Sequence, residues 1–390
     1  MQDMTELSSA MQKRQYNAGM AGFFLSGICA ISAGILVSIL LDLYHFSYGF
    51  SGTLISIMSI GNMLALLLSG ILPAKLGERT TTLILTAGYF LGYGLMALTG
   101  RPALLLAAFL AAGLAKGCAA NKCTILVGQN TDDKPRAMSI MNAWFALGAL
   151  LCPFLISFLG KSSSAASVFG VSAVGLLLWI NFLNAGLPGK TAGVTGRSGK
   201  TDLSFLKSTV FWLLALMLFC ENAAEYTVNG WMVTYYKKEQ ILSPELASYV
   251  VTVQWFLTLL ARLFIAFVLK PKKPYRALSL MGIGLTAAYA LLLRMDSAVP
   301  ALCTLGLFSF CIAGAYPMGV ACVGEMMSSA SVGLILAFAG VGGILFPWFV
   351  GLLSDAAGIR TGMALNLIPC AGIIIIPALL TRLKGQTSRQ

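Results

Sequence analysis

Charged residues are scarce in this chain of 390 residues, where they make up 10% of the sequence against about 25% in soluble globular domains. Hydrophobic residues reach 58%, and the surface of a water-soluble protein cannot be built from what remains. The composition therefore excludes a soluble enzyme. Because a helix that crosses a bilayer takes roughly 20 residues, the chain has room for about a dozen crossings.

Catalytic and metal-binding motifs are also absent from the sequence. It contains one histidine, His45, and no HExxH, GxSxG or Gx4GK[ST] pattern, which argues against a metalloprotease, a serine hydrolase and a P-loop ATPase. Its nine cysteines stand in apolar segments without a CxxC pair and are predicted to be packing residues. We therefore expect no enzyme activity, no cofactor and no metal site.

The net charge of +12 would suit a nucleic-acid-binding protein, so the distribution of the charges has to decide. Lysines and arginines gather in short clusters at alternate turns between apolar segments, as at Lys13 and Arg14, Lys75 and Arg79, and residues 270–276. This is the positive-inside pattern of multi-pass membrane proteins. It predicts a protein of the cytoplasmic (inner) membrane with both termini inside and no nucleic-acid partner.

Twelve apolar segments are long enough to cross the membrane, and one long polar stretch, 187–207, interrupts them near the midpoint. We predict an all-α membrane protein of twelve transmembrane helices in two pseudo-symmetric six-helix bundles. The bundles would cover residues 1–186 and 209–390, with a cytoplasmic linker at 187–208. The segments are 17–42, 50–74, 80–99, 102–128, 137–159, 165–186, 209–236, 246–269, 276–294, 299–326, 332–354 and 361–382.

The fifth and eleventh segments carry matching sequences. The fifth contains Gly148-Ala-Leu-Leu-Cys-Pro153-Phe154, and the eleventh contains Gly342-Gly-Ile-Leu-Phe-Pro347-Trp348. A match at the same place in both halves predicts that the halves are repeats. Two parallel repeats joined by a long inside linker are typical of secondary transporters of the major facilitator type.

The turn between the second and third segments reads Gly70-Ile-Leu72-Pro-Ala74-Lys75-Leu-Gly77-Glu-Arg79. It resembles the signature loop of the major facilitator superfamily, G-x-L-x-D-[RK]-x-G-x-[RK], with Ala74 in place of the acid. Further segments resemble the fucose permease branch, namely residues 111–114, 119–121, 141–148, 315–317 and 342–358. This resemblance implies the major facilitator fold and proton-coupled transport of a sugar.

Two acids that the branch uses for proton coupling are missing. The first segment has no acid before Asp42 at its outer end, and Cys118 stands where the fourth segment would carry a glutamate. Lys122 follows Asn121, where a proline would be usual. Proton coupling by the branch's own route is therefore not expected.

Five ionisable residues lie within predicted membrane segments: Lys116, Lys122, Glu221, Glu225 and Arg262. A charge at mid-membrane costs at least ~2.5 to 3.5 kcal/mol, so each should face a cavity or a partner. The resemblance implies that the first, fourth, seventh and tenth helices line the central cavity. Four of the five residues lie on the fourth and seventh of these.

Asn121 and Lys122 share one face of the fourth helix, about 120° away from Lys116. The resemblance places the Asn121 position toward the cavity, so both residues are candidates for substrate contact. Lys122 could neutralise a carboxylate of the solute. It could instead form a structural ion pair with a carboxylate, or reach toward the inner surface. Lys116 is predicted to be a gating or structural cation.

Glu221, Glu225 and Asn229 follow one another at i, i+4 and i+8 along the seventh helix. Two desolvated carboxylates one turn apart disfavour each other's ionised form, which suits one of them to bind and release a proton. We hypothesise that Glu221 or Glu225 couples transport to protons, and that Glu225 and Asn229 also contact the solute. The alternative is that the two glutamates only balance Lys116 and Lys122.

The remaining candidates are Arg262 and Glu325, as gating or structural residues, and Asn142 and Tyr316, as contacts for the substrate. We therefore predict a secondary transporter that moves a small polar solute, either a sugar or polyol or an organic anion, by alternating access. Coupling to a proton or another ion and a monomeric state are expected. The alternatives are a drug or metabolite exporter of the same fold and a non-transporting membrane sensor.

Overall fold

The computed structural model of the protein describes residues 2–132, 134–188, 204–265, 274–316, 318–319, 322 and 329–387. Within these ranges the chain forms helices and no strand. It divides into two compact units, one of Met1–Tyr44 and Ile57–Gly196 and the other of His45–Ser56 and Arg197–Gln390. The prediction of an all-α membrane fold with twelve transmembrane helices in two bundles is confirmed.

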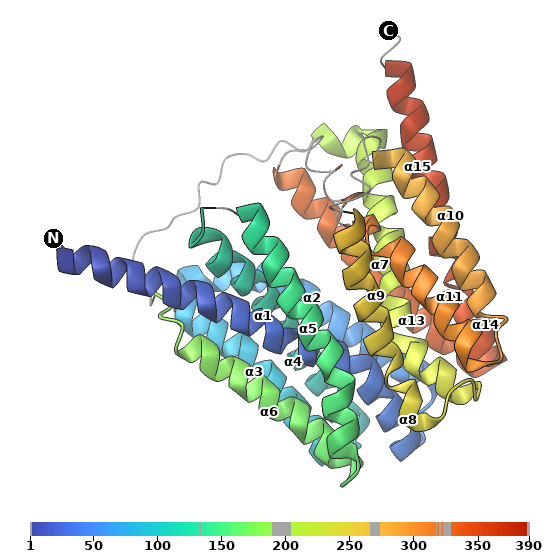
Figure 1. Cartoon of the computed structure of the whole chain (residues 1–390), viewed down its shortest axis with the longest axis horizontal. Helices are drawn as coiled ribbons and strands as arrows, with labels where there is room; N and C mark the ends of the chain where they lie inside the picture. The colour runs from blue at the N-terminus through green and yellow to red at the C-terminus, as the bar shows by residue number, and fades with distance from the viewer. Residues whose placement is uncertain are drawn as a thin grey trace. The chain divides into compact units, whose positions relative to one another are not determined.

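Helix α2 (Tyr48–Leu76) begins in the second unit and continues into the first (Figure 1). The other helices of the first unit are α1 (Gln2–Tyr44), α3 (Glu78–Leu98), α4 (Pro102–Gln129), α5 (Lys134–Gly160) and α6 (Ser164–Leu183). The second unit has η1 (Ser204–Lys207), α7 (Thr209–Lys238), α8 (Pro244–Ala247), α9 (Val250–Phe264), α10 (Pro274–Leu292), α11 (Ala298–Ile312), α13 (Ser329–Ala357), α14 (Ile359–Ala364) and α15 (Leu367–Thr387). Among the described residues, nine helices are long and apolar enough to cross a membrane.

Four helix contacts of the first unit recur in the second. In the first unit, α1 packs on α5 and α6, and α3 packs on α4 and α6. In the second, α7 packs on α13 and α15, and α10 packs on α11 and α15. Each of these four contacts in the first unit therefore has a counterpart in the second, as expected for two repeats of one arrangement.

The glycines that predicted the repeat lie at equivalent contacts. A Cβ atom on Gly148 would lie 2.1 Å from the backbone oxygen of Phe24 in α1, and one on Gly342 would lie 2.2 Å from that of Phe219 in α7. Only a residue without a side chain allows α5 and α13 to approach these carbonyl groups so closely. Gly342 thus allows α13 to pack against α7 as closely as Gly148 allows α5 to pack against α1.

Short-range signals in the sequence define several helix ends. Ser163 accepts a hydrogen bond from the backbone N–H of Ala166 at the start of α6, which is the usual role of a serine N-cap. Gly77 and Gly358 both have φ of 84°, a conformation that glycine adopts readily. They separate α2 from α3 and α13 from α14.

Candidate functional site

The polar stripe on α7 is the main cluster of ionisable groups in the membrane-spanning part of the second unit. Glu221 is 2% exposed, while Glu225 and Asn229 are half-buried. The carboxyl groups of Glu221 and Glu225 lie within electrostatic range of each other. Two carboxyl groups this close repel each other when both are ionised, which suits the pair to sharing a proton.

Three other groups lie within electrostatic range of the two carboxyl groups. They are Arg262 of α9, Tyr226 of α7 and Tyr316, which follows α11. Among the described residues, one oxygen of Glu221, Oε2, has no hydrogen-bond partner. The carboxyl pair therefore lies near one cation and two phenols, and the Oε2 atom of Glu221 can accept a further hydrogen bond.

Arg262 extends from α9 toward the end of α11. Its Nε atom donates a hydrogen bond to the backbone oxygen of Ala313 at 3.3 Å. The residue thus joins two helices near the carboxyl pair. This position fits the gating or structural role that the sequence indicates, which stays a prediction.

One turn beyond Glu225, the amide of Asn229 is held by a second helix. The Nε2 atom of Gln254 in α9 donates a hydrogen bond to the Oδ1 atom of Asn229 at 2.9 Å. Gln254 is 4% exposed, so its position is fixed by packing. With its oxygen occupied, Asn229 keeps its Nδ2 donors for another acceptor.

Lys122 in the first unit is part of a salt bridge. Its Nζ atom pairs with the Oε1 atom of Glu78 in the first turn of α3. The lysine side chain is 8% exposed and the glutamate side chain 30%. Of the three alternatives for Lys122, the structure shows an ion pair with a carboxylate, and the partner comes from α3 rather than from the seventh helix.

We expect this salt bridge to stabilise the first unit. Replacing either partner, by Glu78→Gln or Lys122→Gln, should cost about 1–3 kcal/mol, because the remaining charge loses its counter-ion. The melting temperature in detergent should then fall by several degrees. The double variant should be more stable than the sum of the single changes predicts.

The control for this cycle is Glu245→Gln, which removes an exposed carboxylate and should change stability by less than about 0.5 kcal/mol. Single variants as stable as the parent would contradict a structural role for the pair. Strict additivity in the double variant would show that the two charges do not interact.

The other predicted site residues are dispersed. Asn121 and Lys116 are half-buried on α4, Asn142 is exposed on α5, and Tyr316 is half-buried. Glu325 lies outside the described residues. Within the described ranges no group of three His, Cys, Asp or Glu side chains could hold a metal ion.

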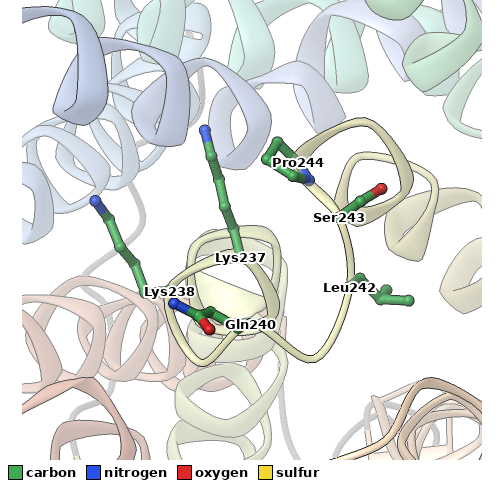
Figure 2. Close-up of a pocket in the computed structure, with 6 residues that line it drawn as sticks. All are labelled: Lys237, Lys238, Gln240, Leu242, Ser243 and Pro244. Atoms are coloured by element: carbon green, nitrogen blue, oxygen red, sulfur yellow. The ribbon is translucent and has the colours of Figure 1, made fainter.

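A cavity of about 440 Å³ lies at the far end of α7, lined by Lys237, Lys238, Gln240, Leu242, Ser243 and Pro244. Figure 2 shows the two lysine side chains extending in similar directions from the helix end, beside the loop that leads to α8. At 1.5 Å per residue the cavity is about 18 Å along the helix from Glu225. It is therefore separate from the carboxyl pair.

The sequence profile of the Major Facilitator Superfamily matches residues 19–332, most of the chain. The chain belongs to the major facilitator superfamily. The family and the fold identify a multi-pass membrane protein and a secondary transporter of small solutes. They point away from an enzyme.

Solved structures of other transporters share the fold. The nucleoside transporter NupG is 17% identical, with a TM-score of 0.79 over 95% of this chain and 99% of its own. A bacterial homolog of the human lysosomal transporter Spinster is 13% identical in two inward-facing structures, one occupied and one unoccupied. Their TM-scores are 0.69 and 0.72, and each covers 96% of this chain and 97% of its own. No curated protein sequence matches this chain.

Two partners in these clusters were missed by the sequence analysis. Glu78 lies in the signature turn, at a position where the pattern G-x-L-x-D-[RK]-x-G-x-[RK] accepts any residue. Gln254 is a single polar residue in the apolar run of α9. A buried amide in such a run is itself a signal, because a polar group in the membrane needs a partner.

Proposed function

We propose that this protein is a proton-coupled secondary transporter for a small, neutral, hydroxyl-rich solute of the sugar, polyol or nucleoside class. It would act as a monomer in the cytoplasmic membrane, with both termini inside and no cofactor, by alternating access. The observation that carries the proposal is the carboxyl pair of the buried Glu221 and the half-buried Glu225, one turn from the amide pair Asn229 and Gln254.

The neutral class of solute is supported by where the cations lie. Lys122 is paired with Glu78, and Arg262 interacts with Glu221 and the backbone of Ala313. A carboxylate on the solute would have to compete with these partners. Amide groups such as that of Asn229 suit hydroxyl and carbonyl groups instead.

The resemblance to the fucose permease branch and the fold shared with NupG, a nucleoside transporter by its title, support the same class. Sugars and nucleosides both present a sugar ring that carries hydroxyl groups. Asn121, Asn142 and Tyr316 remain the further predicted contacts for such a ring, and Lys116 remains a predicted structural cation. Asn229 is the contact that the geometry supports best.

The proton site is proposed on α7 because the two positions at which the branch carries coupling acids have none in this chain. One of them is Cys118, and the other lies in the apolar first helix. The Glu221 and Glu225 pair can hold one proton between its two carboxyl groups. The nearby Arg262 would compensate the charge when that proton leaves. Binding of solute at Asn229, one turn away, could then change the proton affinity of the pair.

A thermal-shift experiment on the purified protein tests the solute class. Neutral sugars, polyols and nucleosides are compared with small carboxylates, using the parent, Asn229→Ala and Lys122→Gln. A solute at 100 times its Kd stabilises a protein by about 2.7 kcal/mol. We expect a neutral solute to give such a shift, Asn229→Ala to weaken its binding about tenfold or more, and Lys122→Gln to retain it.

Stabilisation by a carboxylate that disappears in Lys122→Gln would contradict this proposal. It would show that the ion pair with Glu78 opens for substrate, and that the protein is an organic-anion carrier. If the parent and Asn229→Ala bound the stabilising solute with equal affinity, Asn229 would not be a contact for the solute.

A further inference from the structure

The signature turn of the first unit has a second copy in the other unit. Residues 70–79 carry Gly, Leu, Gly and Arg at positions 70, 72, 77 and 79, and residues 351–360 carry the same four types at 351, 353, 358 and 360. The second glycine of each pattern, Gly77 or Gly358, has the same backbone angles, φ 84° and ψ 156°. The two segments therefore form the same turn, but the acid of the pattern is absent at Ala74 and present at Asp355.

The carboxylate of Asp355 caps the beginning of α2. Its Oδ1 atom accepts a hydrogen bond from the backbone N–H of Tyr48 at 2.7 Å, and its Oδ2 atom accepts one from Gly49 at 2.6 Å. The first N–H groups of a helix have no partner within the helix, and its N-terminus carries partial positive charge. A carboxylate with one oxygen on each of two successive N–H groups satisfies both requirements.

Below this cap, α2 and α13 are packed backbone to backbone. A Cβ atom on Gly351 would lie 2.5 Å from the backbone oxygen of Tyr48, and one on Gly52 would lie 2.9 Å from that of Pro347. The hydroxyl of Ser56 donates to the backbone oxygen of Ile344 at 2.6 Å. We call this contact, between residues 48–56 and 344–355, the α2–α13 seam.

The seam ends where the compact units divide. Residues up to Ser56 belong to the second unit, and α2 continues from Ile57 in the first. Because one continuous helix is shared in this way, a change in the angle between the units has to bend α2 near Ser56, open the seam or break the remaining contacts of α2. The seam is short, and its only charged group is the Asp355 cap.

We propose that Asp355 is a latch that holds the α2–α13 seam closed and so biases the transport cycle toward the state closed at this end. On the orientation that the basic residues predict, this end faces outside. The turn at residues 70–79 would face inside, and it has Ala74 rather than an acid at the position that matches Asp355. This inference rests on the proposed function, since a latch matters only in a protein that alternates between two states.

The test uses two variants that open the latch in different ways. Asp355→Asn removes the charge and retains the shape of the side chain. Gly49→Ala retains the charge, but its Cβ atom would lie 2.7 Å from the Oδ2 atom of Asp355 and displace the carboxylate. Alanine is also the better helix former, so Gly49→Ala should not weaken α2 itself.

The reporter is a cysteine in the seam, Ile55→Cys, in a background where the exposed Cys303 is replaced by serine. Ile55 is 6% exposed and packs on Gly230 of α7, so a cysteine there is shielded while the seam is closed. A membrane-impermeant maleimide, added without any solute, should label it about 3- to 10-fold faster in both latch variants, the range expected for a lost helix cap.

The controls are Asp132→Asn, an exposed acid, and Gly94→Ala, where the added Cβ has only an ordinary contact of 3.4 Å. Both should label at the parent rate. Unchanged labelling in Asp355→Asn and Gly49→Ala would overturn the latch. Solute counterflow by the same variants tests the proposed function separately, since the labelling needs no solute: absent counterflow with faster labelling would refute transport and leave the latch standing.

Discussion

Replacing Glu221 by Gln is expected to abolish the accumulation of solute that a pH gradient drives, while exchange of solute across the membrane continues. Gln keeps the size of the side chain but cannot bind and release a proton. With one proton per solute, one pH unit supports about tenfold accumulation. A potential of 100 mV, about 2.3 kcal/mol per charge, supports about 40-fold. In the variant the accumulation ratio should fall to about 1.

Glu225→Gln should have the same effect, because the two carboxyl groups interact electrostatically and the proposed coupling site consists of both. The matched control is again Glu245→Gln, an identical substitution at an exposed position, which should accumulate solute as the parent does. The measurement is uptake of labelled solute into proteoliposomes with an imposed gradient, beside counterflow without one. Full accumulation by the double variant Glu221→Gln and Glu225→Gln would eliminate the pair as the coupling site.

The fold could be predicted from the sequence because the bilayer imposes a simple condition, that each crossing is an apolar helix of about 20 residues. Hydropathy locates the crossing but not the helix ends. Helix α1 begins at Gln2 rather than near residue 17, since its polar first turns are good helix formers that extend beyond the apolar segment. The segments predicted at 246–269 and 361–382 each begin within a short separate helix, α8 and α14, rather than at the start of the long helix.

The candidate site was predictable only where its residues lie on one helix. Glu221, Glu225 and Asn229 share a face because helical periodicity places them there, and the two carboxyl groups lie within electrostatic range of each other. Their partners on other helices, such as Gln254, could not be found in this way, since periodicity within one segment says nothing of which segment packs against it. Lys122 illustrates the limit: its burial was foreseen, but its pairing with Glu78 depends on how α3 and α4 pack.

The repeat, in contrast, makes a strong prediction about stability. Gly342→Ala is expected to destabilise the protein by about 1–3 kcal/mol or more, because the new methyl group would lie 2.2 Å from the backbone oxygen of Phe219 and α7 would have to move away from α13. In an unhindered helix the same substitution is favourable by about 1 kcal/mol. The sign of the effect therefore distinguishes a close helix contact from intrinsic helix propensity.

Gly148→Ala should behave alike, since its methyl group would meet the oxygen of Phe24 at 2.1 Å. Gly94→Ala, with room for the methyl group, should be neutral or stabilising. Melting curves in detergent and the yield of monodisperse protein measure both effects. Only Gly342→Ala should also impair proton-driven uptake in whatever protein remains folded, because α7 carries Glu221 two residues beyond Phe219. If both alanines were tolerated, that would contradict the close packing of α5 on α1 and of α13 on α7.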